Sequence, residues 1–370
     1  KEDGSFRLNQ KYFDYATGLT MTNNHFDDLF RSKPRNPKKD KISQFYMDIA
    51  ASIQKVTENL MIRLAKSLSN EYKIKNLCLA GGVALNCVAN GKILKENIFD
   101  NIWIQPAAGD AGGSLGASLV YWYNELCNER ITSTKDSMNC SYLGPEYSDE
   151  EIENILKSIG ANYKKTTKEN IIDYTTNKII QGKVIGWFQG KMEFGPRSLG
   201  NRSILGDARS PEMQKKLNLK IKFRESFRPF APSVLLEKAS EWFDINIESP
   251  YMLLVTNVKK DKLVDNLNNS QNVKGLEKLN LVRSQIPAVT HVDYSARVQT
   301  VTDKNGIYYE LIKDFYKKTN CPVIVNTSFN VRGEPPVNTP IDAYKCFMAT
   351  DLDILIMGSF IIEKENQINF

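Results

Sequence analysis

The chain has 370 residues, enough for two or three domains, and its 41% hydrophobic and 25% charged residues exclude global disorder. Its net charge of +6, from 49 Lys and Arg against 43 Asp and Glu, fits an anionic small substrate and does not argue for nucleic acid. Six cysteines form no CxxC pair, and no apolar run could cross a bilayer, so we expect a reduced, soluble, cytoplasmic protein.

The first part of the chain alternates polar segments with strand–turn–helix units. Residues 1–41 end in the basic run "RSKPRNPKKDK", a surface loop or a loop that touches phosphate. Apolar residues then recur every three or four positions from Phe45 to Leu64, which predicts a long helix. The stretches "NLCLAGGVALN" and "NIWIQPAAGDAGGSLGA" each read as a strand, a glycine turn and a helix, which is α/β architecture. Because the chain begins at Lys1 in mid-pattern, we expect an N-terminal portion to precede it.

A polar stretch places a domain boundary near residue 140, so we predict domains at 1–139 and 140–370. The second domain has helical patterns at 149–159, 168–181, 211–221, 237–243, 306–318 and 340–349. Strands are predicted at 184–190, 228–236, 251–258, 296–302, 322–329 and 354–362, with an excursion loop at 259–286.

The two glycine turns carry candidate ligand residues. Gly81 and Gly82 would let backbone N–H groups approach a phosphate or a ribose, and Asn86 could bond a sugar hydroxyl; the alternative is a tight turn. Asp110 stands among small residues, where a carboxylate holds a metal or a phosphate-bound water, or else caps a turn. His25 and His291 have no partner at metal-ligand spacing, so any metal site is incomplete.

Cations collect in the second domain, embedded in Gly-, Pro- and aromatic-rich motifs. The candidates are Arg197 and Arg202 in "KMEFGPRSLGNRSIL", Lys222, Arg224 and Arg228 in "KFRESFRPFAP", Arg297 in "HVDYSARVQT", and Arg332 with Ser328 and Asn330 in "NTSFNVRGEPP". Each arginine could instead pair with a nearby acid, namely Glu193, Asp207, Glu225, Asp293 or Glu334. Two like charges about 4 Å apart repel by roughly 4 kcal/mol at a dielectric near 20, so a convergent set would need an anion.

These motifs, in register and over nearly the whole chain, resemble the O-carbamoyltransferases of nodulation-factor and antibiotic biosynthesis, of the NodU, CmcH and tobramycin carbamoyltransferase type. The resemblance implies a partial actin/hexokinase-like (Kae1-like) lobe followed by a YrdC-like twisted α/β domain. It implies that the YrdC-like part makes carbamoyl adenylate from carbamoyl phosphate and ATP. The Kae1-like part, with a divalent metal (iron or Mg), would then pass the carbamoyl group to an acceptor hydroxyl.

The resemblance also assigns roles by position. Lys222, Arg228 and Arg197 match the carbamoyl-phosphate and nucleotide-phosphate ligands, which we take as the catalytic set, and Arg297 and Arg332 match further phosphate ligands. Ser328 and Asn330 match carbamoyl or nucleotide contacts, with Arg224 and Arg202 as further cations. Gly81, Gly82 and Asn86 match the nucleotide site, and Asp110 matches the metal ligand. Phe194, Phe227 and Phe230 would wall off water, or would be ordinary core.

One departure from the family pattern bears on function. The family's other metal ligands are two histidines of an N-terminal lobe, and no such pair stands in this chain, so the transfer half is expected to be incomplete. The alternatives are a non-catalytic nucleotide-binding module, a threonylcarbamoyl-adenylate synthase and an RNA-binding protein. The last is disfavoured, because the cations lack the aromatic-interleaved stripe of an RNA surface. The sequence indicates neither the acceptor nor the oligomeric state.

Overall fold

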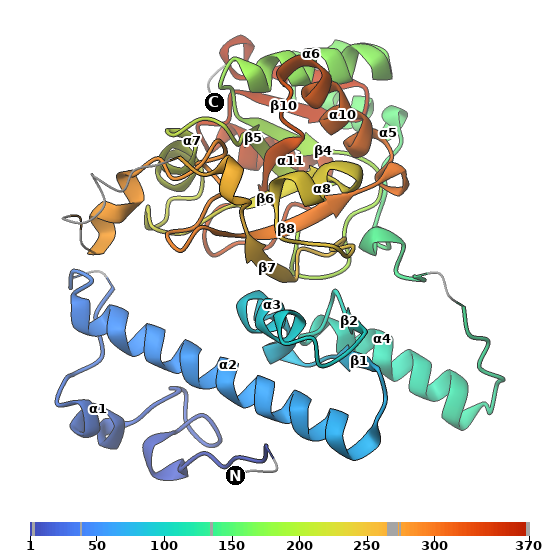
Figure 1. Ribbon diagram of the computed structural model, residues 1–370. Helices are drawn as coiled ribbons and strands as arrows, with labels where there is room; N and C mark the ends of the chain where they lie inside the picture. The colour runs from blue at the N-terminus through green and yellow to red at the C-terminus, as the bar shows by residue number, and fades with distance from the viewer. Residues whose placement is uncertain (2–3, 38, 134–135, 265–272, 274, 368–370) are drawn as a thin grey trace. The chain divides into compact units, whose positions relative to one another are not determined.

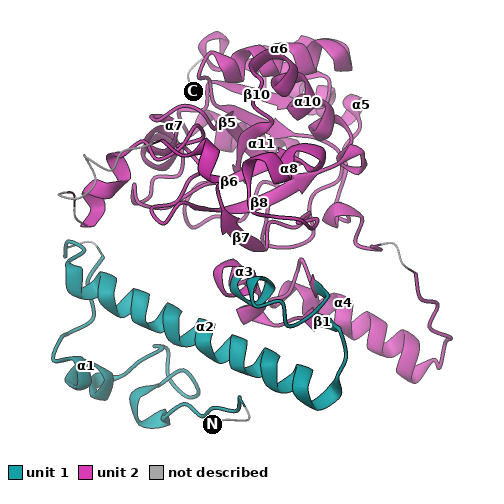
Figure 2. Ribbon diagram, viewed as in Figure 1, with its two compact units in different colours: residues 1–77, 92–102 teal, residues 78–91, 103–370 magenta. Residues whose placement is uncertain are grey.

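A computed structural model describes residues 1, 4–37, 39–133, 136–264, 273 and 275–367 (Figure 1). The chain forms two compact units: residues 1–77 with 92–102, and residues 78–91 with 103–370 (Figure 2). These bounds differ from the predicted division at 139/140, which remains a prediction of domain organisation. Within the described residues no helix is both long and apolar enough to cross a membrane.

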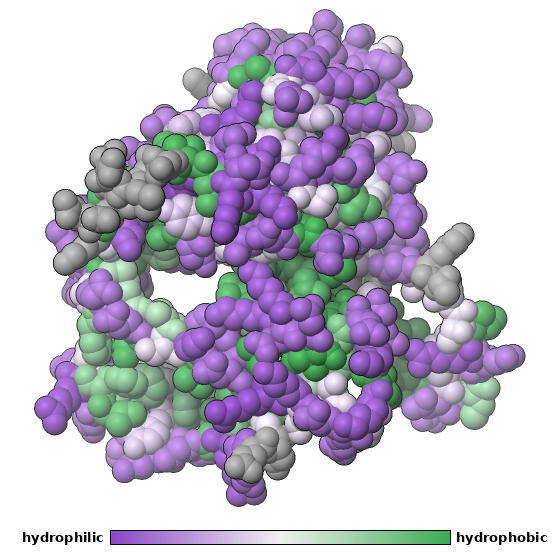
Figure 3. Space-filling view, in the orientation of Figure 1, coloured by the Kyte–Doolittle hydropathy of each residue, from purple (hydrophilic) through white to green (hydrophobic). Residues whose placement is uncertain are grey.

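The smaller unit is built around one long helix. It holds α1 (Asn24–Phe30) and α2 (Gln44–Tyr72), and salt bridges such as Lys66 Nζ to Glu96 Oε2, 2.6 Å, tie α2 to the segment beyond residue 92. The predicted long helix is confirmed, but its apolar face is poorly covered, since Ile53 is 62% exposed. Figure 3 shows hydrophobic residues at the surface around α1 and α2.

Both predicted strand–turn–helix units form. Strands β1 (Asn76–Leu79) and β2 (Asn101–Ile104) make a two-stranded sheet. β1 leads through the glycine turn and the short η2 (Gly82–Leu85) into α3 (Cys87–Lys95), and β2 leads into α4 (Ala111–Val120) and the π-helical turn η3 (Tyr121–Glu125). The hydrophobic runs and the glycines thus determine these elements locally.

The larger unit is a mixed nine-stranded sheet with helices packed on it (Figure 1). The strand order is β3-β11-β10-β4-β5-β9-β6-β8-β7, where β4 and β10, and β6 and β8, run parallel and the other neighbours run antiparallel. The strands are β3 (Lys164–Lys165), β4 (Ile185–Phe188), β5 (Arg202–Asp207), β6 (Ala231–Leu235), β7 (Leu254–Asn257), β8 (Ser295–Val301), β9 (Val323–Ser328), β10 (Ile354–Met357) and β11 (Phe360–Glu363).

Helices bury the apolar faces of this sheet. They are α5 (Asp149–Ser158), α6 (Lys168–Ile180), α7 (Met213–Lys216), α8 (Leu236–Trp242), α10 (Ile307–Thr319) and α11 (Pro340–Met348). α10 packs against α6 and β6, and α11 against β4 and β10. Their side chains join one hydrophobic core in which Trp187 and Phe315 are fully buried. The chain is therefore a mixed α/β protein, as expected.

Three local differences from the predictions concern the second domain. The stretch 354–362 is two antiparallel strands, because Gly358 has φ +51 and turns the chain. The helix predicted at 211–221 becomes the π-helical turn η5 (Leu217–Ile221) after α7. The arginine-rich motif itself ends in β5, a strand not predicted. The excursion loop at 259–286 lies partly outside the described residues.

Candidate anion-binding site

The motif at 191–205 is organised around a buried carboxylate. Glu193 Oε1 accepts hydrogen bonds from the backbone N–H groups of Leu199 (2.7 Å) and Asn201 (2.8 Å). Gly200 has φ +118, and a Cβ there would lie 2.2 Å from the Tyr308 ring, so glycine is required on both grounds. The turn is therefore fixed from inside, and Arg197 is held within it.

Arg197 is a partly buried cation with few partners. Its Nη2 donates to the carbonyl of Leu85 at 3.4 Å, and its buried Nε has no hydrogen-bond partner among the described residues. Burial lowers the pKa of Arg197, since desolvation disfavours the charged form. A guanidinium in this condition can accept an anion as a further partner.

Arg297 brings a second guanidinium to the same place from strand β8, where it is paired in register with Val255 of β7. Burial lowers the pKa of Arg297 to about 10, and repulsion from Arg197 and Arg224 adds to this effect. Cys87, at the start of α3, is its hydrogen-bonding neighbour. These arginines are thus close enough to repel one another in a desolvated setting.

Lys222, at the end of η5, is almost completely buried, with 3% of its surface exposed. Its ammonium donates to Asn330 Oδ1 (2.8 Å), to the Asn330 carbonyl (2.9 Å), to Ser328 Oγ (3.2 Å) and to the Ser328 carbonyl. Burial, followed by repulsion from Arg224, lowers the pKa of Lys222 to about 7. Ser328 and Asn330 therefore position this lysine, and no carboxylate neutralises it within the described ion pairs.

Two of the remaining three cations share one acid. Glu225 forms ion pairs with Arg228 Nε at 3.2 Å and with Arg332 Nη1 at 3.3 Å. Arg224 Nε donates instead to Asn218 Oδ1 at 2.7 Å, and burial, with repulsion from Arg228, lowers the pKa of Arg224 to about 10. One carboxylate thus serves two arginines and leaves the third unneutralised.

Six cations therefore form what we call the cation cluster: Arg197, Lys222, Arg224, Arg228, Arg297 and Arg332. The described residues do not pair each arginine with an acid of its own. Of the five acids considered from the sequence, only Glu225 forms ion pairs with the cluster, since Glu193 binds backbone and Asp207 pairs with Arg209. This excess of positive charge, buried or partly buried at Arg197, Lys222, Arg224 and Arg297 and half exposed at Arg228 and Arg332, can bind a multiply charged anion.

Arg202, predicted beside these residues, is placed elsewhere. It is fully buried in β5, stacks on the Phe188 ring at 3.6 Å, and donates to the backbone carbonyls of Gln189 and Asn201. These contacts use its guanidinium for packing, so we leave Arg202 out of the proposed ligand set.

The first glycine turn lies next to the cluster through the residues that follow it. Leu85 and Cys87 contact Arg197 and Arg297, respectively. Gly81 has φ +91 and, like Gly82, open space around the position of a Cβ, while Asn86 Oδ1 accepts the N–H of Ala89 at 3.1 Å and caps α3. Gly81 and Gly82 are exposed, so a ligand has room to approach the backbone of this turn.

Asp110 does not form a metal site with the residues at hand. It is exposed at the start of α4 and its side chain makes no cap hydrogen bond. The part of the chain that the structure describes holds no group of three or more His, Cys, Asp or Glu side chains placed to bind a metal. The described residues by themselves therefore do not form a site that fits a divalent metal.

Sequence reasoning missed two residues that shape the site. Glu193 was considered only as a partner of an arginine, although it organises the backbone of the motif. Asn218 donates to the carbonyls of Ser226 and Arg228 and so fixes the loop that carries the cations. The one indication in the sequence that Glu193 organises the turn was its position directly before a glycine-rich stretch.

Two family models match this chain: the carbamoyltransferase C-terminus over residues 176–364 and the carbamoyltransferase N-terminus over residues 1–119. The chain belongs to the carbamoyltransferase family. The resemblance inferred from the motifs is thereby confirmed. The C-terminal match spans the whole cation cluster of this carbamoyltransferase chain.

Individual relatives agree with this assignment. An uncharacterized protein of Synechocystis sp. is 54% identical over 99% of this chain and 60% of its own length. Nodulation protein NolNO of Sinorhizobium fredii is 40% identical over 91% of this chain and 47% of its own. Nodulation protein NolO of Bradyrhizobium diazoefficiens is 38% identical over 91% and 58%. The carbamoyltransferase chain thus spans about half the length of the curated relatives it matches.

Among solved structures, full-length HypF in the phosphate- and nucleotide-bound form is similar, with a TM-score of 0.35 and 16% identity over 53% of this chain and 22% of that one. A similarity at this level supports no inference about the site.

Proposed function

We propose that this region of the carbamoyltransferase makes carbamoyl adenylate from carbamoyl phosphate and ATP, for transfer to the hydroxyl of a small-molecule acceptor. In this proposal residues 140–370 are the YrdC-like adenylate-forming domain and residues 1–139 belong to a Kae1-like transfer domain. The observation that carries it is the cation cluster: among the described residues only Glu225 forms ion pairs with it, and Glu225 pairs with just two of the six cations.

The positive charge of the cluster would counter the electrostatic repulsion between the two anionic substrates of this reaction. Carbamoyl phosphate loses its phosphate to water, a carbamate oxygen attacks the α-phosphorus of ATP, and pyrophosphate leaves. Both substrates are polyanions, and charge builds on the phosphate oxygens in the transition state. Prepositioned guanidinium and ammonium groups stabilise that charge without reorganisation, so no nucleophilic side chain is required.

Individual residues then take specific roles. Arg197 and Arg297, which have no acid partner in the described structure, would hold the nucleotide phosphates between them. Lys222, which Ser328 and Asn330 hold in place, would contact the anion, and the lysine would be protonated when the anion is bound. Arg228 and Arg332 would exchange part of their interaction with Glu225 for the substrate.

The test is exchange of labelled pyrophosphate into ATP, measured with and without carbamoyl phosphate. We expect exchange that depends on carbamoyl phosphate and falls about 10²–10³-fold in Arg297→Gln, by analogy with the loss of an oxyanion donor. Arg228→Ala should fall in the same direction. Arg130→Gln, at an exposed arginine outside the cluster, is the matched control.

The same assay separates the alternatives. Exchange supported by bicarbonate and threonine in place of carbamoyl phosphate would indicate a threonylcarbamoyl-adenylate synthase. ATP binding without exchange would indicate a non-catalytic module. Equal exchange in Arg297→Gln and Arg130→Gln would refute the role of the cluster.

A further inference from the structure

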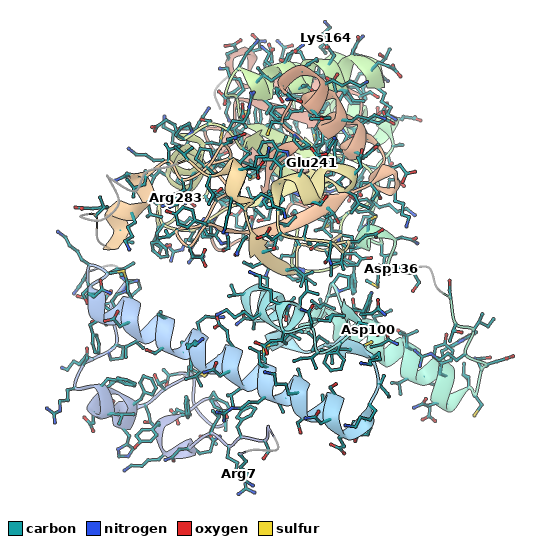
Figure 4. The ribbon with its side chains drawn as sticks, viewed as in Figure 1. Arg7, Asp100, Asp136, Lys164, Glu241 and Arg283 are labelled. Atoms are coloured by element: carbon teal, nitrogen blue, oxygen red, sulfur yellow. The ribbon has the colours of Figure 1, made fainter. Side chains whose placement is uncertain are left out.

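A cavity of about 530 Å³ lies in the larger unit, lined by residues of α7, the loop before β6, the segment around η7 (Gly275–Asn280) and the loop before β8. This volume is in the range of small-molecule sites, about 300–1,000 Å³. Apolar wall groups come from Phe227, Pro229 and Val292, and polar groups from residues that include His291 and Arg283. Figure 4 labels Arg283, which donates to the carbonyls of Leu281 and Lys278.

The cavity and the cation cluster share two segments of the chain. Phe227 and Pro229 flank Arg228 in one loop. Ser295, which bonds His291, stands two positions before Arg297 on β8, so both side chains lie on one face of that strand. A ligand with an anionic end on the cluster could therefore place its other end in the cavity.

Hydrogen bonds determine the tautomer of His291. The Ser295 hydroxyl donates to Asp293 Oδ1 at 2.6 Å, so its one proton is used. His291 Nδ1 lies 3.0 Å from the same hydroxyl oxygen and must then be the donor. Burial lowers the pKa of His291 to about 4; the charge of Asp293 opposes this shift, and the charges of Arg297 and Arg283 add to it. The ring is therefore neutral, and Nε2 carries a lone pair that can only accept a hydrogen bond.

We propose that this cavity receives the base of the nucleotide, and that His291 Nε2 selects a purine with a 6-amino group by accepting one of its protons. This inference rests on the proposed function, which supplies a nucleotide. A flat heterocycle suits the Phe227 ring and the apolar side chains beside it. A 6-oxo purine would turn a second acceptor toward Nε2, so the buried groups would stay unpaired.

The test compares ATP with ITP, which differ at position 6 of the base. We expect the wild type to bind ATP at least about tenfold more tightly than ITP. His291→Phe, which keeps the ring size and removes the acceptor, should weaken ATP binding and bring the ratio of the two dissociation constants close to one. ITP affinity should change little. Thermal unfolding checks that each variant folds.

Two further variants keep the inference testable if His291→Phe fails to fold. Ser295→Ala removes the hydroxyl that keeps the His291 proton on Nδ1, so it should reduce the preference for ATP over ITP. Phe227→Ala removes the ring on which the base would stack, so it should weaken the binding of ATP and ITP equally. Equal binding of ATP and ITP by the wild type, or an unchanged ratio in His291→Phe or Ser295→Ala, would overturn the assignment of His291. Failure of the wild type to bind either nucleotide would instead overturn the proposed function.

Discussion

Two buried charged side chains of the site are held by backbone or neutral polar groups and form no direct ion pair within the described residues. Glu193 is the one carboxylate that holds the arginine-rich turn, and Lys222 is an ammonium surrounded by oxygens of Ser328 and Asn330. Both arrangements are costly to alter, because a buried polar group that loses its partner pays the full desolvation penalty. Substitutions of Glu193 and Lys222 should therefore have measurable effects on stability.

Replacing Glu193 tests whether the turn depends on its carboxylate. Glu193→Ala leaves the N–H groups of Leu199 and Asn201 unpaired, and we expect a loss of about 1–3 kcal/mol in the free energy of unfolding. Glu193→Gln keeps one oxygen acceptor and should retain part of both stability and pyrophosphate exchange. Chemical denaturation measures the first quantity. Equal stability of all three proteins would contradict this role.

Lys222 gives stability a predictable pH dependence. Its pKa falls from 10.5 in the unfolded chain to about 7 in the fold, so between these values the unfolded state binds more protons. Stability should consequently rise with pH across that window, with Lys222 contributing a slope of about 1 kcal/mol per pH unit.

The measurement is the difference in slope between wild type and Lys222→Met by chemical denaturation from pH 7 to pH 10. Tyr142 and Tyr308, whose pKa values are raised chiefly by burial, act in the opposite direction at high pH. They are present in both proteins, so the comparison cancels them. Identical slopes would show that Lys222 is not desolvated.

Elements meet through close backbone contacts at the site. α3 begins at Cys87 beside Arg297, and Asn90, at the end of its first turn, donates to the carbonyls of Ala84 and Leu253. Gly91, the next residue, lies so near β7 that a Cβ would be 2.0 Å from the carbonyl oxygen of Val255. The start of α3 is therefore seated on the strand that pairs with β8.

The contact predicts opposite effects for two helical glycines. Gly91→Ala forces the start of α3 away from β7 and should cost about 1–3 kcal/mol of unfolding free energy. Gly116→Ala, in α4, meets open space and should instead stabilise by about 0.5–1 kcal/mol through lower chain entropy. Denaturant midpoints of the two variants give the comparison. An unchanged free energy of unfolding in Gly91→Ala would contradict the close packing of the start of α3 on β7.

At the scale of the whole molecule, the cluster gathers like charges whose mutual repulsion a bound anion would relieve. Burial lowers the pKa of Arg197, Arg224 and Arg297. Repulsion from Arg197 and Arg224 adds to this effect at Arg297, and repulsion from Arg228 adds to it at Arg224. Whatever binds the folded state alone stabilises it by mass action, about 2.7 kcal/mol at one hundred times the dissociation constant.

We therefore expect pyrophosphate to raise the midpoint of thermal unfolding, with a smaller effect as salt concentration increases. Arg297→Gln should reduce the shift and should be at least as stable as wild type without ligand, because one repelling charge is gone. Differential scanning fluorimetry measures both quantities. An unligated Arg297→Gln that unfolds well below wild type would mean that Arg297 mainly serves packing.

The sequence determined the local elements of this protein, because apolar spacing and glycine punctuation act over a few residues. The long helix at 44–72, both glycine turns and most strands followed from it, as did the set of motif cations. It did not distinguish Arg197 from Arg202, five positions apart in one motif. Strand pairing of β5 with β4 buries Arg202 on Phe188, whereas the turn held by Glu193 places Arg197 beside Arg297. Only the tertiary structure decided that difference, since the direction of a side chain depends on which distant strands its own segment pairs with.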